Sequence, residues 1–183
     1  MAKVNSLRQL RLQLPFFVLL SIVQLSLHAQ KGLKRSITDG GDTSYYTTEK
    51  RIYTKSGSRN AVAEILKTTF YRYPNHYSLC FFIQTGRTSH FSISKGDEAI
   101  LGWTADDNIS VTCRNSNESK PSRIDYGGWI YVFYSISPSQ LKKLQEKPIK
   151  YIRIKSSTGW MIYDISEKNA REVMEQAEKI GDR

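Results

Sequence analysis

The sequence is poor in the residues from which catalytic and metal sites are usually built. Its 183 residues include 2 Cys and 3 His. Two cysteines are too few for a disulfide-dense scaffold or a cysteine-rich zinc site. The sequence also lacks four motifs: Gly-x-Ser-x-Gly, His-Glu-x-x-His, the phosphate-binding Gly-x-x-x-x-Gly-Lys-Ser/Thr loop and Gly-x-Gly-x-x-Gly. These absences argue against an α/β-hydrolase, a zincin and a nucleotide-binding fold.

Acidic residues are also scarce, because 17 Asp and Glu stand against 27 Lys and Arg, which gives a net charge of +10. Hydrophobic residues make up 39% of the chain and charged residues 24%. These values are typical of a chain that folds around an apolar core rather than a disordered one. The length allows one domain, or at most two small ones.

The apolar run near the N-terminus, from Leu14 to Leu27, is shorter than the ~20 residues of a membrane span. Three basic residues precede it: Lys3, Arg8 and Arg11. A basic start, a short apolar core and a small residue before the cut, here Ala29, are typical of a secretory signal peptide. We therefore expect residues 1–29 to be cleaved and the protein to be periplasmic or extracellular, with no stable membrane span. A retained membrane anchor is the alternative.

The chain that remains after this cleavage stays basic. It keeps 24 basic residues against 17 acidic ones, a net charge of +7. The charges are scattered, and the densest group is Lys31, Lys34 and Arg35. We expect residues 30–42 to form a flexible basic lead-in and residues 43–183 to form a single domain. In an exported protein this charge does not indicate a nucleic-acid partner.

Segments of alternating or β-branched residues between turn signals predict a series of strands. They are Tyr45–Thr54, 64–73, Tyr77–Gln84, His90–Ser94, Ala99–Thr104, Ile109–Arg114, Trp129–Ile136, Ile149–Lys155 and Trp160–Ile165. Residues 61–73 also fit helical spacing. Because Pro74-Asn75 is a tight turn followed by a clear strand, a hairpin of 64–73 with 77–84 is the simplest arrangement. Residues 115–122 are typical of a polar loop.

Two segments predict helices. Ser137, Pro138 and Gln140 form a capping box with proline at the first helical position, and this helix ends before Pro148. Ser166 begins the second helix, whose apolar stripe consists of Ala170, Val173, Met174, Ala177 and Ile180. The fold class that follows is α+β. It is mainly an antiparallel sheet or sandwich, with one short helix and a C-terminal amphipathic helix.

Half of the chain after the signal resembles a known group of proteins. The pattern consists of an Ile-Ser-Lys-Gly turn at 93–96, a helix start at 134–141, the segment Pro-Ile-Lys-Tyr-Ile-Arg-Ile at 148–154, and the terminal amphipathic helix. It resembles small exported proteins of unknown function from Bacteroidota. The resemblance implies a Gram-negative, exported protein, and it brings no catalytic residues because its motifs concern packing and capping.

Few residues are candidates for chemistry. Cys80 and Cys113 both fall in predicted strands, where they form either a disulfide across the sheet or two buried thiols. His76 and His90 are the histidines that follow the signal, so a three-histidine metal site is excluded. A mixed metal site with Asp106 and Asp107 is an alternative, although Ala-Asp-Asp-Asn is first of all a turn. We assign no residue a catalytic, cofactor-binding or metal-ligating role.

Aromatic side chains are the most suggestive feature. Trp103, Trp160 and Tyr73 are candidates for stacking on a ligand, with burial in the core as the alternative. Trp129, Tyr131 and Phe133 lie on one face of a strand whose other face is also apolar, which predicts a central strand buried on both faces. The tyrosines that flank the Pro74 turn predict an exposed aromatic cluster: Tyr71, Tyr73 and Tyr77.

These observations favour an exported, non-enzymatic protein that binds a protein, peptide or glycan through a face or an edge of its sheet. The alternative is a small extracytoplasmic hydrolase or metal-dependent enzyme that uses His76 or His90 with carboxylates. A pocket that gathers a histidine with carboxylates favours the enzyme. An exposed aromatic face favours binding.

Overall fold

The computed structural model describes residues 32–37, 41–56, 63–86, 90–121 and 127–181. The chain divides into two compact units, Met1–Gly32 and Leu33–Arg183. The expected signal peptide, residues 1–29, lies outside the described residues. Within the described part of the chain, no helix has the length and apolar character needed to cross a membrane.

The second unit is built around a sheet of 11 strands in which every pairing is antiparallel. The main path of the sheet runs β1-β2-β4-β5-β11-β8-β7-β12-β13, while β3 pairs with β4 and β10 pairs with β11. The strands are β1 (Leu33–Ile37), β2 (Thr43–Thr47), β3 (Lys50–Lys55), β4 (Glu64–Arg72), β5 (Tyr77–Gln84), β7 (Glu98–Gly102), β8 (Asn108–Cys113), β10 (Lys120–Pro121), β11 (Gly128–Ile136), β12 (Tyr151–Ser156) and β13 (Gly159–Asp164). A separate pair joins β6 (Ser92–Ile93) to β9 (Asn117–Glu118).

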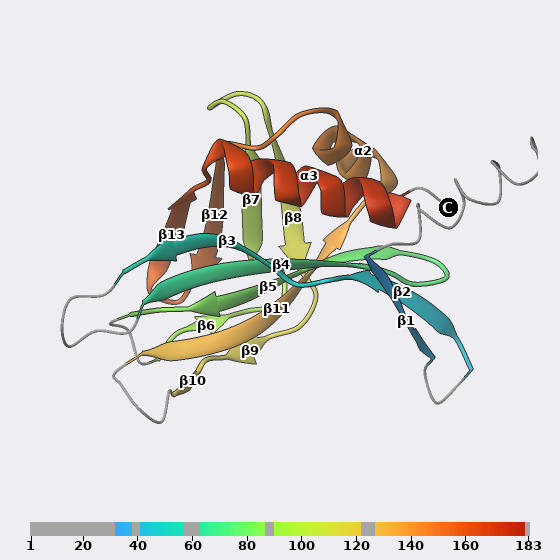
Figure 1. Ribbon diagram of the computed structural model, residues 1–183. Helices are drawn as coiled ribbons and strands as arrows, with labels where there is room; N and C mark the ends of the chain where they lie inside the picture. Colours follow the sequence, from blue (N-terminus) through green and yellow to red (C-terminus); the bar gives the residue numbers. More distant parts are fainter. Residues whose placement is uncertain (1–31, 38–40, 57–62, 87–89, 122–126, 182–183) are drawn as a thin grey trace, which may run out of the picture. The chain divides into compact units, whose positions relative to one another are not determined.

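The two helices cover one side of this sheet (Figure 1). Helix α3 (Glu167–Gly181) packs on β2, β3 and β4, and α2 (Pro138–Glu146) packs on α3. The sheet is curved, because the rings of Tyr53 on β3 and Tyr163 on β13 meet at 5.1 Å, although β13 ends the strand order and β3 pairs with β4, which five strands separate from β13 along that order. The core fills the concave side. The α+β, sheet-dominated fold predicted from the sequence is confirmed.

The ambiguous segment 61–73 is a strand over the residues that are described. Strand β4 pairs with β5 from Ile65 opposite Gln84 to Arg72 opposite Tyr77. Leu66 and Phe70 are fully buried on the core side. The β-branched residues and the turn at Pro74 thus decide the structure of this segment, and its helical spacing does not. As a strand, the segment pairs with β5 across the turn and its apolar face lies on the core.

Both predicted helices are present. Ser137 accepts a hydrogen bond from the Gln140 backbone, and the Gln140 side chain accepts one from the Ser137 backbone, which completes the capping box. In α3 the buried stripe includes Ala170, Val173, Ala177 and Ile180. Capping and periodicity are local signals, and here the tertiary structure does not override them.

Two segments expected to lack strands contain them. Leu33–Ile37 of the expected flexible lead-in forms β1, because each of its residues pairs with one of β2. The expected polar loop 115–122 contains β9 and β10. In contrast, the single strand expected at Tyr45–Thr54 is two strands, β2 and β3, which are separated by Thr48 and Glu49 and both pair with β4.

The two cysteines are free and buried. Cys80 stands opposite Phe133, and Cys113 stands opposite Tyr134. Phe133 and Tyr134 are consecutive on β11, so the two thiols lie on opposite faces of the sheet. This register rules out the disulfide considered from the sequence and leaves its alternative, two buried thiols.

Strand β11 is central, since it pairs with β5 on one side and with β8 and β10 on the other. Its core face, which carries Val132 and Tyr134, is fully buried. The other face is not, because Tyr131 is 45% exposed. The prediction that both faces are buried is therefore wrong. The second face carries a row of aromatic rings, and the described helices α2 and α3 lie on the other side of the sheet.

Candidate functional site

An aromatic face lies on the convex side of β2, β4, β5 and β11. We give this name to seven rings whose strand positions or ring contacts place them together: Tyr46, Tyr71, Tyr73, Phe82, Trp129, Tyr131 and Phe133. Residues directly opposite each other in an antiparallel pair point to the same side. Tyr131 stands opposite Phe82, and Tyr71 stands opposite Tyr46. The alternation that buries Val132 and Tyr134 thus turns these rings outward.

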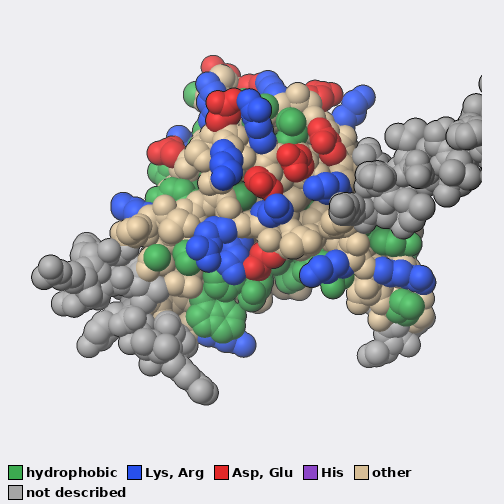
Figure 2. Space-filling model, viewed as in Figure 1, with side chains coloured by type: hydrophobic (Ala, Val, Ile, Leu, Met, Phe, Trp, Pro, Cys, Tyr) green, Lys and Arg blue, Asp and Glu red, His purple; other side chains and the backbone are tan. Residues whose placement is uncertain are grey.

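The rings form two contact groups. In one, Phe82 lies 4.9 Å from Tyr131 and 6.2 Å from Trp129 between centroids. In the other, Tyr71 lies 5.6 Å from Tyr46 and 5.5 Å from Phe133. Tyr131 and Phe133 are two positions apart on one strand, so the two groups adjoin on the same face. Hydrophobic side chains gather along β11 in Figure 2, with basic side chains beside them.

Basic residues accompany the rings. The Lys67 ammonium lies 4.7 Å from the Phe82 centroid, and that of Lys120 lies 5.5 Å from the Trp129 centroid. Cations over ring faces are attracted by the negative potential of the π system. Register adds Arg51, opposite Lys67, and Lys34, opposite Tyr46. The face is therefore both aromatic and positively charged.

Glu49 provides a carboxylate among these cations. Its Oε1 lies 2.7 Å from the Lys67 ammonium nitrogen. Burial and then the nearby Glu49 carboxylate raise the pKa of Tyr131 above its ordinary value. Tyr131 thus carries a neutral hydroxyl at physiological pH, and one lysine of the face is already paired.

His76 closes one end of the aromatic face. Its ring stacks on Tyr73 at 4.5 Å, and its Nε2 lies 2.6 Å from the Arg114 Nη1. The same Nη1 donates to the Ser78 hydroxyl at 2.9 Å. Burial and then the neighbouring Arg114 charge lower the pKa of His76. The neutral imidazole accepts the hydrogen bond from Arg114, so the contacts of this histidine are a cation and a ring rather than a carboxylate.

A pocket of about 420 Å³ lies beside this end of the sheet. It is bordered by the β4–β5 turn, by the end of β11 and by the start of α2. Tyr73 and His76 line it and also belong to, or contact, the aromatic face. Its lining residues include no aspartate or glutamate.

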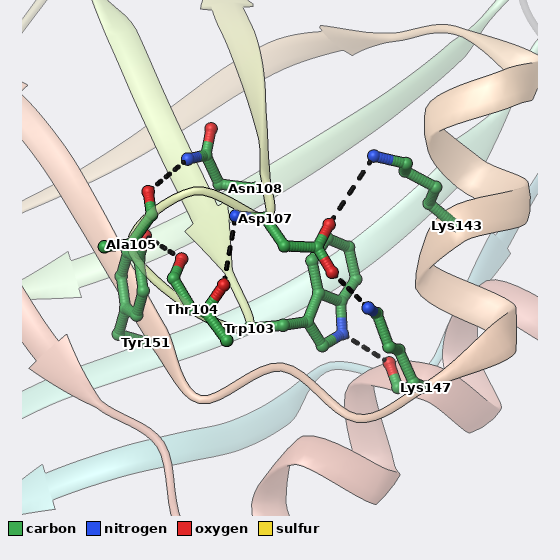
Figure 3. A network of polar contacts seen from close by, with 8 residues as sticks. All are labelled: Trp103, Thr104, Ala105, Asp107, Asn108, Lys143, Lys147 and Tyr151. Carbon is green, nitrogen blue, oxygen red and sulfur yellow. Dashed lines mark hydrogen bonds and ion pairs between the residues drawn. The ribbon is translucent and has the colours of Figure 1, made fainter.

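Trp103, one of the predicted stacking residues, is a core residue that is 4% exposed. Its indole N–H donates to the Lys147 carbonyl at 2.9 Å, and the Lys147 ammonium lies 5.0 Å from its ring (Figure 3). The tryptophan therefore secures the end of α2 against the β7–β8 turn. It offers no free ring to a ligand.

Asp107 belongs to the same network. Its carboxylate pairs with Lys147 and lies 3.7 Å from the Lys143 ammonium (Figure 3). The hydrogen bond with Lys147 is the main cause of its lowered pKa. Asp106 is exposed in the same turn. The described residues contain no group of three His, Cys, Asp or Glu placed to hold a metal ion.

The other candidates are dispersed. Trp160 is 47% exposed on β13, opposite Lys155, and lies on strands other than those of the aromatic face. His90 is exposed, just ahead of β6. Tyr73 alone among the three predicted stacking residues belongs to the aromatic face. Of the cluster predicted around the Pro74 turn, Tyr71 and Tyr73 are half-buried on this face, whereas Tyr77 stands opposite Arg72 and packs against the core.

Sequence reasoning missed the residues that give this face its character. Phe82, Lys67 and Lys120 were assigned no role, although Lys67 and Phe82 both lie in a predicted hairpin. The signal lay in the alternation of that hairpin: once its register is known, Lys67 stands opposite Phe82. Lys120 carries no such signal, because β10 was expected to be loop.

Comparison with known proteins gives no match: no family model, no curated protein and no solved structure matches this chain.

Proposed function

We propose that this is an exported, non-enzymatic binding protein whose aromatic face holds an extended, acidic peptide segment of a partner protein. The observation that carries the proposal is the row of rings on β5 and β11, half-buried at Phe82, Trp129 and Phe133 and exposed at Tyr131, with lysines and an arginine beside them. Tyr131, at 45% exposure, is the centre of this row. Aromatic residues and arginine are enriched where proteins bind each other.

The charges of the face favour an acidic partner. Lys67 is partly neutralised by Glu49, whereas Arg51, Lys34 and Lys120 add positive charge to the same face. An acidic segment is attracted electrostatically by these charges as it approaches, and this attraction decreases at high salt. A basic or neutral segment is not attracted in this way.

A peptide suits the face better than a neutral glycan. Sugar rings stack on open ring faces, but lysine ammoniums already stand over Phe82 and Trp129. Carboxylate side chains of a peptide can pair with those lysines while its apolar side chains lie between the rings. An extended strand of about eight residues spans about 26 Å, which is on the scale of the strands that carry the face.

The alternative of a small extracytoplasmic hydrolase or metal-dependent enzyme is less well supported. Its base would be His76 or His90 with a carboxylate partner. The contacts of His76 are Arg114 and Tyr73. A cation beside the imidazole opposes the protonated state that a general base must reach.

The proposal can be tested with a synthetic peptide of about eight alternating Glu and Tyr residues, blocked at both ends. We expect a dissociation constant below about 1 mM at low salt, measured by calorimetry. Amide shift changes in NMR spectra should fall on β4, β5 and β11. A Lys/Tyr peptide of the same length and a neutral cello-oligosaccharide serve as comparison ligands and should bind more weakly.

Variants locate the binding surface. Tyr131→Ala should weaken binding of the Glu/Tyr peptide about tenfold, as expected for a central interface residue. The double variant Lys67→Gln, Lys120→Gln should weaken it and flatten its salt dependence. Trp160→Ala is the matched control, because it removes an exposed ring on another strand. Equal binding of the Lys/Tyr peptide, stronger binding of the oligosaccharide, or equal losses for Trp160→Ala and Tyr131→Ala would each overturn the proposal.

A further inference from the structure

The pocket beside the aromatic face has one cationic lining group at its inner side. Arg72 is the last residue of β4 and stands opposite Tyr77 on β5 and Tyr45 on β2. Alternation along β4 places it on the same side as Phe70, toward the core. The remaining walls include the apolar surfaces of Tyr77, Ile136 and Pro138. An arginine thus lines a pocket whose other walls are largely apolar.

The guanidinium of Arg72 is incompletely satisfied. Its Nη1 is buried and has no hydrogen-bond acceptor among the described residues. A guanidinium carries five N–H donors, and buried donors in folded proteins are nearly always paired. The pocket offers this group no carboxylate of its own, because its lining contains no aspartate or glutamate.

The surroundings of the pocket add positive potential. Helix α2 begins at its rim with Ser137 and Pro138, and the N-terminus of a helix carries partial positive charge. Arg114 stands just behind His76. Tyr73 and Tyr77 also line the pocket, and a tyrosine hydroxyl can donate a hydrogen bond. An arginine with tyrosines in a small apolar pocket is suited to a carboxylate attached to an apolar group.

We propose that this pocket binds the C-terminal residue of the peptide held on the aromatic face, with the terminal carboxylate paired to Arg72. This inference rests on the proposed function for the rest of the peptide. Tyr73 connects the two surfaces, since it lines the pocket and lies 6.2 Å from Tyr71 between ring centroids. At about 420 Å³ the pocket has room for one aromatic residue. In Figure 1 the β4–β5 turn and the start of α2 lie at the same end of the sheet.

A small probe tests the pocket separately from the face. N-acetyl-tyrosine carries one ring and one carboxylate, and N-acetyl-tyrosine amide lacks the charge. In NMR titrations of the unmodified protein, the acid should shift the backbone amide signals around the pocket: Arg72, Tyr73, Asn75, His76, Tyr77, Ile136, Ser137 and Ser139. N-acetyl-tyrosine amide should bind at least about tenfold more weakly than the acid, since a charge-assisted hydrogen bond is lost. This comparison needs no variant and does not depend on the folding of one.

Variants then separate this inference from the proposed function. Arg72→Gln should abolish the preference for the acid and leave binding of the end-blocked Glu/Tyr peptide within about twofold. Arg72→Lys keeps the charge but loses the paired donors, and should recover only part of the preference. Tyr131→Ala should weaken binding of the Glu/Tyr peptide and leave binding of N-acetyl-tyrosine unchanged. Arg171→Gln, an exposed arginine on α3, is the matched control.

The peptide also distinguishes two sources of the carboxylate. A Glu/Tyr peptide with a free C-terminus should bind about tenfold more tightly than the amidated form, and Arg72→Gln should remove that difference. Equal binding of the two peptides would show that a side-chain carboxylate or none occupies the pocket, and would overturn the C-terminal assignment. Equal shifts with N-acetyl-tyrosine and its amide would overturn the carboxylate site itself, whatever the outcome for the face.

Discussion

Tyr134 illustrates how a single buried residue is held by packing rather than by polar contacts. It is fully buried, and its ring meets that of Phe81 edge-on at 5.6 Å. Its hydroxyl has no hydrogen-bond partner among the residues that the structure describes. Tyr134→Phe therefore removes an unpaired polar group and keeps the ring. We expect the free energy of unfolding in urea to stay the same or rise by up to about 1 kcal/mol.

The control for this prediction is a tyrosine whose hydroxyl is paired. Tyr151 donates to the Thr104 carbonyl at 3.1 Å. Tyr151→Phe should lower the free energy of unfolding by about 0.5–1 kcal/mol. A loss above about 1 kcal/mol for Tyr134→Phe would contradict the assignment of an unpaired hydroxyl.

The protonation of His76 is the second property at this scale. Burial and then Arg114 lower its pKa below the ordinary 6.5. Since the folded pKa is below the unfolded one, its contribution to stability is complete above pH 6.5 and is lost as the pH falls below that value. An NMR titration of the ring protons should give a midpoint below 6.5, and Arg114→Gln should raise it. A midpoint that Arg114→Gln does not move would contradict a role for that charge.

The cysteines give a prediction about reactivity. Burial, then the Glu49 carboxylate, raise the pKa of Cys80 to about 12, and burial also raises that of Cys113. Alkylation requires the thiolate, so we expect slow labelling of the folded protein at neutral pH. In denaturant, both thiols should react fully without a reductant. A thiol that reacts only after reduction would contradict the free cysteines.

At the scale of the element, Gln176 attaches α3 to the sheet. It is 2% exposed. Its Oε1 accepts from the Thr68 hydroxyl at 2.7 Å, and its Nε2 donates to the Thr48 carbonyl at 2.7 Å. The Thr47 hydroxyl lies 3.1 Å from the same Nε2 and accepts from the Phe70 backbone at 3.0 Å. One polar side chain within an apolar helix stripe thus sets the position of α3 over β2 and β4.

Gln176→Ala should lower the free energy of unfolding by about 2–3 kcal/mol, because it leaves buried donors and acceptors of two strands unpaired. Urea unfolding followed by circular dichroism measures the loss. Glu175 precedes Gln176 on the exposed side of α3. Glu175→Gln breaks only a surface ion pair with Lys179 and should lower the free energy of unfolding by less than about 0.5 kcal/mol. Similar losses for the two variants would show that α3 is held by its apolar stripe alone.

Element prediction succeeded where the signals were local. The capping box at Ser137 and the stripe from Ala170 to Ile180 each determine a helix by contacts within a few residues of the chain. The hairpin of β4 with β5 follows from the turn at Pro74 and the strands around it. Strand β1 was missed because its polar sequence has no apolar face that would indicate a strand. It is a strand because its backbone pairs with that of β2.

At the scale of the whole molecule, the expected export can be tested by the intact mass of the protein recovered from the periplasm or medium of an expressing Gram-negative cell. We expect a chain that begins at Gln30. A variant with Leu19→Arg and Leu20→Arg, which interrupts the apolar run, should keep its full-length mass in the cytoplasm. A full-length mass for the exported wild-type chain would contradict the cleaved signal.

The candidate site was predictable only in part. The tyrosines near Pro74 were expected to form an exposed cluster, but Tyr71 and Tyr73 are half-buried on the aromatic face and Tyr77 packs against the core. The rings of β11 were expected to be buried, because both faces of this strand are apolar. That pattern does not distinguish a strand covered on both faces from one with an exposed aromatic face. Trp103 was a candidate platform, but its indole N–H has a partner at the end of α2, 44 residues away.

By itself the sequence determined the features set by neighbours along the chain: the helix that begins at the Ser137 cap, the amphipathic α3 and the hairpin around Pro74. Only the tertiary structure decided which side of β11 remains uncovered. Strand order and register are long-range choices, and they place Lys67 against Phe82 and Cys80 on the face opposite to Cys113. The location of α2 and α3 on one side of the sheet then leaves the aromatic face on the side opposite to these helices.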